Sequence, residues 1–193
     1  MGLFVREIWA EIKPSYPIKL KTSSANDENN IDESKDAGYK DLGFGAAAGA
    51  GAQVSSKVSI GLQLGGESSR SALGPTYSVE PMFYVRLRAG MTNDVNEILD
   101  IGLGYWKQYA SNGKYSFSGA QIRVSEGYLL GEDDKKTRYL LSGGVNLRLN
   151  TGETGDIPTS FRHEILECFG YVSVGIRLSN GKPQENKEAA NSQ

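Results

Sequence analysis

The chain has 193 residues, a formal net charge of −2 and a hydrophobic fraction of 38%. This length is typical of one domain, and a chain without a basic block is not expected to bind nucleic acid. Its apolar runs fall short of the roughly 18 residues that predict a membrane-spanning helix. The single cysteine, Cys168, excludes an internal disulfide and a cysteine-built metal site. The first residues, MGLFVREIWAEI, lack the basic start and apolar core of an export signal.

Eight segments alternate between apolar and polar residues with the period of two that β-strands have. These segments are residues 4–20, 42–54, 58–65, 77–91, 97–109, 115–130, 139–150 and 164–178. In the seventh, YLLSGGVNLRLN, one face carries apolar residues such as Leu147, and the other carries polar residues such as Asn146 and Arg148. The alternation breaks near Glu126 and Gly127 in the sixth segment, which predicts a β-bulge there.

The connections between these segments alternate in length along the chain. The first is a 20-residue polar loop at 22–41, and the third (66–76) and last (151–160) are also long, whereas most of the others are short. An up-and-down barrel in an outer membrane has short turns at one end and long loops at the other, which produces this pattern. We therefore predict a single barrel domain over residues 1–179 and a disordered polar tail over 180–193.

The polar faces of the strands carry many glycines and serines together with arginines. Glycine contributes nothing to a solvated sheet, but small residues suit the cramped interior of an eight-stranded barrel. Arginine suits enclosed ion pairs, whereas most of the lysines fall in loops or tails. We therefore predict an interior ion network and no wide pore. Its members are Glu11, Glu80, Arg86, Arg88, Asp100, Arg123, Arg148, Glu167 and Arg177.

Aromatic residues gather near the two ends of the predicted strands, with aliphatic residues between them. Membrane interfaces select such aromatic belts. At the loop end we predict Tyr16, Phe44, Tyr77, Tyr105, Tyr109 and Tyr115. At the turn end we predict Trp9, Tyr128 and Tyr139. The polar face would then point inward and the apolar face outward.

From residue 4 to residue 178 this pattern resembles the small eight-stranded bacterial outer-membrane barrels, the OmpX type and the transmembrane domain of OmpA. The resemblance lies in the strand number, the loop alternation and the glycine- and arginine-rich interior. It implies an all-β, antiparallel, up-and-down transmembrane barrel in the bacterial outer membrane. Membrane lipid or lipopolysaccharide would surround it, and a surface ligand or protein would bind its long loops. The chain departs from the family in ending without a terminal aromatic residue and in having Pro14, Pro17 and Pro81 within strands.

Two other functions fit parts of the sequence. A soluble calycin-like barrel that binds a small apolar ligand would need the apolar face inward. A lipid-modifying barrel enzyme would need a catalytic constellation, and the single histidine, His163, lies near Ser160, Glu164 and Glu167. This spacing matches no signature, and the acidic segments lack the spacing of a calcium loop. We therefore expect no enzyme, no metal and no cofactor.

Overall fold

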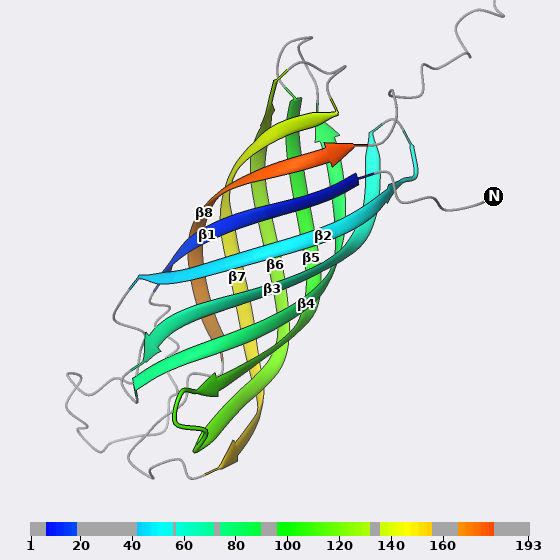
Figure 1. Cartoon of the computed structure of the whole chain (residues 1–193). Coiled ribbons are helices and arrows are strands. Elements are labelled where there is room, and N and C mark those ends of the chain that lie inside the picture. Colours follow the sequence, from blue (N-terminus) through cyan, green and yellow to red (C-terminus); the bar gives the residue numbers. More distant parts are fainter. Residues whose placement is uncertain are drawn as a thin grey trace, which may run out of the picture.

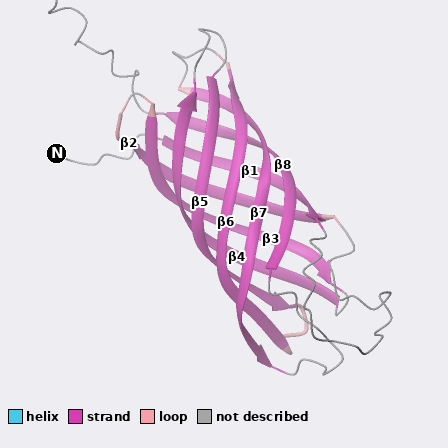
Figure 2. Ribbon diagram, turned by 180° about the vertical axis from the view of Figure 1, so that it is seen from behind, coloured by secondary structure: helices cyan, strands magenta, loops and turns pink. Residues whose placement is uncertain are grey.

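The computed structural model describes residues 7–18, 42–55, 57–71, 74–89, 96–131, 136–155 and 166–179. Eight antiparallel strands form a closed barrel (Figures 1 and 2). The strands are β1 (Glu7–Ile18), β2 (Gly43–Gln53), β3 (Val58–Ser71), β4 (Gly74–Ala89), β5 (Asn96–Ala110), β6 (Tyr115–Leu130), β7 (Thr137–Gly155) and β8 (Leu166–Ser179). Among these residues, no helix is long and apolar enough to cross a membrane.

Each strand pairs with its neighbour in the chain, and β8 pairs with β1 to close the barrel. The closing ladder runs from Glu7 opposite Ser179 to Ile18 opposite Cys168. Because every strand has two partners, the barrel has no open sheet edge. The predicted eight-stranded, antiparallel, up-and-down barrel is therefore confirmed.

The apolar face of each strand points outward and the polar face points inward. In β7, Tyr139 and Leu141 are 60% and 45% exposed, whereas Asn146 and Arg148 are 2% and 1% exposed. The other strands repeat this arrangement, as in β6, where buried and exposed residues alternate along most of the strand. The calycin-like alternative needs the opposite arrangement and is therefore wrong.

The third connection is shorter than the sequence pattern indicated. Residues 66–76 were expected to form a long loop, but β3 continues to Ser71 and β4 begins at Gly74. Ser71 pairs with Gly74, and Glu67 pairs with Ser78. The polar residues of this segment hide a strand in the sequence pattern, because Glu67 and Ser69 find partners in Ser15 and Thr76.

The bulge lies at the opposite end of β6 from its predicted place. The register between β6 and β7 shifts between Ser118 and Gly119, whereas Glu126 and Gly127 pair regularly with β7. Glu126 points outward and Gly127 inward, so the alternation continues through them. A Cβ on Gly119 would collide with the backbone oxygen of Leu149, which explains why glycine stands at this close approach.

The prolines within strands are accommodated by local gaps in one ladder. The pairing of β4 with β5 is interrupted at Pro81, which has no N–H to donate. The register of β4 and β5 is the same on either side of this gap, with Val79 opposite Lys107 before it and Met82 opposite Gly104 after it. The pairing of β1 with β8 is likewise interrupted at Pro14. Pro14 and Pro81 therefore interrupt one ladder each without shifting the register of the strands.

Glycines on the inner face make room for large interior side chains. A Cβ on Gly49 would lie 2.7 Å from the Trp9 ring. On Gly61 it would lie 2.7 Å from the Tyr84 ring and closer still to the backbone oxygen of Ala50. On Gly65, in contrast, its nearest neighbour would be 3.5 Å away, an ordinary contact. Some interior glycines are thus required by packing and others are not.

Gly61→Ala is expected to lower the free energy of unfolding by about 1–3 kcal/mol, because the added methyl group overpacks the interior. Gly65→Ala, on the same face of the same strand, is the matched control. It is expected to change stability by less than about 1 kcal/mol, because its methyl group fits and alanine loses less backbone entropy. Urea unfolding followed by tryptophan fluorescence measures both. Equal effects of the two substitutions would contradict this account of the interior.

Candidate functional site

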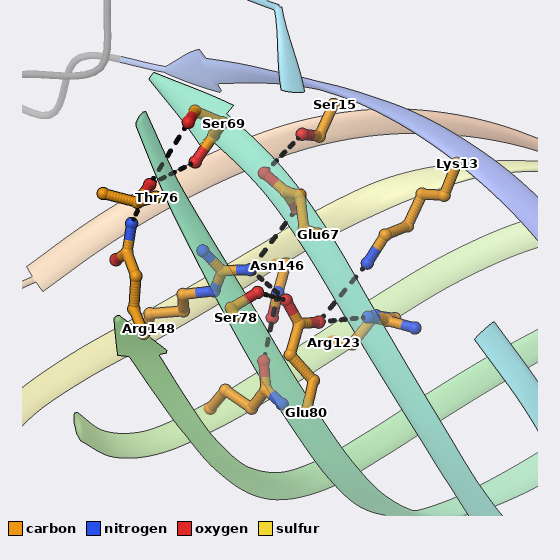
Figure 3. A network of polar contacts seen from close by, with 12 residues as sticks. Lys13, Ser15, Glu67, Ser69, Thr76, Ser78, Glu80, Arg123, Asn146 and Arg148 are labelled. Carbon is orange, nitrogen blue, oxygen red and sulfur yellow. Dashed lines mark hydrogen bonds and ion pairs between the residues drawn. The ribbon is translucent and has the colours of Figure 1, made fainter. Parts of the chain in front are cut away.

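The centre of the barrel interior is the carboxylate of Glu80, on β4, which is fully buried (Figure 3). Arg123 donates to its Oε2 over 3.0 Å, and Lys13 lies 3.4 Å from the same oxygen. Its Oε1 accepts hydrogen bonds from Ser78, at 2.7 Å, and from Arg148. Three cations from β1, β6 and β7 therefore converge on one carboxylate of β4. A carboxylate in this position stays ionised because its partners replace the water it has lost.

Glu67, on β3, extends this cluster towards the loop end of the barrel. Its Oε2 lies 3.4 Å from Nη2 of Arg148, and its Oε1 accepts a hydrogen bond of 2.8 Å from Ser15. Arg148 thus joins the carboxylates of Glu67 and Glu80 (Figure 3). The guanidinium of Arg148 also lies 4.6 Å from the centre of the Phe169 ring. An aromatic contact and ionic contacts therefore both fix the position of this side chain.

A second cluster surrounds Glu7 near the turn end. Its Oε2 lies 2.6 Å from Arg177, and its Oε1 accepts a hydrogen bond of 3.0 Å from the Tyr84 hydroxyl. Arg86 lies 3.6 Å from Glu7 and donates two 2.7 Å hydrogen bonds to Asp100. This paired geometry is the strong form of an arginine–carboxylate contact.

The remaining members of the predicted network also lie inside the barrel. Arg88 reaches Glu7 at 4.0 Å. Glu11 accepts a 2.8 Å hydrogen bond from Ser173 and lies 3.8 Å from Arg123. Glu167 is buried directly opposite Arg148 in the register of β7 and β8. The structure thus brings all nine predicted residues to the interior.

Three charged residues of the clusters were missed by the sequence reasoning. Glu7 and Lys13 alternate with Glu11 along β1, so the period of two alone would have placed them inside. The association of lysine with loops does not predict Lys13, which is 1% exposed. The prediction of a loop at 66–76 does not include Glu67, which is buried on β3. For each of the three residues, the period of two along the strand predicts the inward position better than the residue type does.

Apolar layers lie beside the ion clusters. Trp106, Ala110, Tyr115 and Phe117 form a buried cluster towards the loop end. Ile98, Leu129 and Leu140 form another towards the turn end. A small interior cavity of about 10 Å³ lies between Trp9, Tyr171 and their neighbours. That is room for about one water molecule, so the interior around it is filled by side chains.

Seven of the nine residues predicted for the aromatic belts point outward. They are Tyr16, Phe44, Tyr77, Tyr105, Tyr109, Tyr128 and Tyr139, and all are exposed. Trp9 and Tyr115 were assigned wrongly, because both are buried inside the barrel. The Trp9 indole donates a 3.1 Å hydrogen bond to the Tyr84 hydroxyl, and Tyr115 packs on Phe117. In the alternation along their strands, both residues fall on the inward, polar face. Glycines on this face, such as Gly49 beside Trp9, leave space for large side chains.

The described residues contain no group of three or more metal-ligating side chains. The possible catalytic residues Ser160, His163 and Glu164 lie outside the described residues. Inside the barrel, the acidic and basic groups are paired with one another and packed against aromatic rings. Such an arrangement can hold the interior closed and rigid.

These observations define a small closed barrel with a charged interior and an apolar exterior, the reverse of a water-soluble protein. No family model matches the chain, and no curated protein does. Among solved structures, the crystal structure of Neisserial surface protein A is similar, with a TM-score of 0.61 and 9% sequence identity. The match covers 93% of this chain and 100% of that chain. The chain thus has the fold of a small barrel of the outer-membrane type, and the narrower likeness to the OmpX and OmpA barrels stays a prediction.

Removing the central carboxylate is expected to cost more than removing one of its partners. Glu80→Ala leaves Lys13, Arg123 and Arg148 without their shared anion and should destabilise the barrel by about 3–5 kcal/mol. Arg148→Ala should cost on the order of 3 kcal/mol, because Lys13 and Arg123 still neutralise Glu80. Urea unfolding in detergent micelles, followed by the fluorescence of the interior tryptophans, gives both values.

The matched control for Glu80 is Glu126, a carboxylate on the outer face of β6. Glu126→Ala removes no buried ion pair and should change stability by about 0.5 kcal/mol or less. A Glu80→Ala variant as stable as Glu126→Ala would show that the interior network does not stabilise the barrel.

Proposed function

We propose that this chain is a small outer-membrane β-barrel of a Gram-negative bacterium, with a non-enzymatic role at the cell surface. The observation that carries the proposal is the apolar exterior of a closed barrel. Leu64 and Leu103 point outward from the middle of their strands, and Leu62 points outward nearer the start of β3; all three are 55–69% exposed. Water would contact this surface at a large free-energy cost, whereas lipid hydrocarbon contacts it without one.

Exposed tyrosines and Phe44 lie nearer the strand ends than Leu64 and Leu103 do. Amphipathic rings favour the level of the lipid headgroups. The similarity to Neisserial surface protein A supports the same location and a surface role without catalysis. Membrane lipid, including lipopolysaccharide, would therefore be the partner of the outer face.

The filled interior supports a scaffold in preference to a channel. Arg86, Arg148 and Glu80 are at most 1% exposed and occupy the space that a porin leaves to water. A rigid barrel is a suitable support for loops that bind other molecules. Structural, adhesive or ligand-recognising roles therefore rest on the long polar connections, above all residues 22–41, which lie outside the described part of the chain.

The membrane location predicts a depth-dependent cost for a charge on the outer face of β3. Leu64→Arg, at mid-strand, is expected to destabilise the barrel in lipid vesicles by about 2–4 kcal/mol. Ser68→Arg, on the same face nearer the loop end, is the matched control and should cost about 0–1 kcal/mol. Unfolding titrations in phospholipid vesicles measure both. If Leu64→Arg cost no more than Ser68→Arg, the outer face would not lie in hydrocarbon.

The closed interior predicts that the reconstituted chain gives no large, stable, porin-like conductance. The ion clusters and the apolar layers beside them are buried and occupy interior space that a porin leaves to water. Planar-bilayer recordings of the purified barrel test this, with a known porin as the positive control. Sustained conductance of porin size would contradict the scaffold role.

A further inference from the structure

The outward faces of the described strands carry charges of opposite sign at the two ends of the barrel. Arg70 on β3 and Lys107 on β5 lie towards the loop end. Glu97 on β5 and Glu126 on β6 lie towards the turn end. A charge on the outer face of a membrane barrel is tolerated near an interface and costly at mid-depth. These four positions therefore indicate where the apolar band begins and ends.

The spacing along β5 matches the thickness of such a band. Glu97 and Lys107 are ten residues apart on the same face, which is roughly 33 Å along a strand. A strand tilt of about 40° turns this into roughly 25 Å of height, the height of the apolar band in outer-membrane barrels. The outward residues between them are Leu99, Ile101, Leu103 and Tyr105. Lys107 would therefore lie among the lipid headgroups at the loop end.

Hydroxyl groups and an aromatic ring surround Lys107 on the outer face. Its ammonium lies 5.2 Å from the centre of the Tyr109 ring, and Ser118 is directly opposite it on β6. In the next row, Ser116 and Thr154 share a hydrogen bond of 2.7 Å. We call these five residues the lysine–serine patch. Among the described residues, no carboxylate lies within ion-pair distance of Lys107.

We propose that the lysine–serine patch binds the phosphorylated sugar headgroup of lipopolysaccharide, which deepens and rests on the proposed membrane location. The ammonium of Lys107 is a compact positive charge suited to a phosphate. The hydroxyls of Ser116, Ser118 and Thr154 can donate to and accept from phosphate oxygens and sugar hydroxyls. A phospholipid has one phosphate and a smaller headgroup than a phosphorylated sugar, so it would use the cation and fewer of these hydroxyls. The carboxylates of the turn end, with their negative charge, would disfavour the same anionic headgroup there.

The test measures the binding of purified lipopolysaccharide to the folded chain in detergent micelles by native mass spectrometry. Lys107→Gln is expected to weaken binding at least fivefold, and Ser116→Ala combined with Ser118→Ala at least twofold. Lys57→Gln, in the turn at the other end, is the matched control and should bind like the unaltered chain. Chemically dephosphorylated lipopolysaccharide should bind weakly and should not distinguish Lys107→Gln from the unaltered chain.

Two results would overturn the proposal. One is equal binding of lipopolysaccharide by Lys107→Gln and the unaltered chain. The other is equal affinity for phosphatidylglycerol with the same loss in Lys107→Gln, which would identify a general phosphate contact instead of a glycolipid site. Insertion into vesicles, assayed separately by protease protection, tests the membrane location itself. If the chain inserts but fails the binding test, the patch proposal is rejected and the proposed function stands. If the chain does not insert, both proposals are rejected.

Discussion

The contact on which the rest of this structure depends is the convergence of Lys13, Arg123 and Arg148 on the buried carboxylate of Glu80. Charges removed from water are tolerated only when partners replace the lost hydration. Here the partners come from strands on different sides of the barrel, so the cluster forms only when β8 pairs with β1 and the sheet closes. Closure in turn satisfies the backbone hydrogen bonds of every strand, as a lipid environment requires.

Volume is the second constraint inside the barrel. Trp9 and Tyr84 fit because Gly49 and Gly61 have no side chains beneath them. The large and small residues of neighbouring strands are thus complementary, and the rings also cover the guanidinium group of Arg86. Ionic and aromatic contacts fill the same space together. A rigid core of this kind supports loops and leaves little room for solute.

The outer face has a different chemistry, and its few charges follow the ends of the apolar band. Arg70 and Lys107 share an end with the long predicted loop at 22–41, whereas Glu97 and Glu126 share the other end with the short turns. The asymmetry of charge therefore agrees with the end at which the longest connection is predicted. Both would orient the barrel in the same direction in an asymmetric membrane.

Alternation along the chain was enough to predict the eight strands, their order and the face on which most residues lie, because the period of two is a local property of extended backbone. Where other rules were preferred to alternation, the prediction failed. Trp9 and Tyr115 were placed outside as aromatics, and Lys13 was overlooked as a lysine. The bulge was expected at Glu126 because a charge interrupted the apolar face.

Only the tertiary structure decided which charges meet. Glu11 and Ser173 are 162 residues apart in the chain, and Glu67 and Arg148 are 81 apart. Their contacts depend on the register of several ladders and on the closure of the barrel, which no local pattern contains. The sequence by itself thus determined which residues share the interior. The partner of each one follows from the tilt and register of the closed sheet, because these bring side chains of distant strands to the same height.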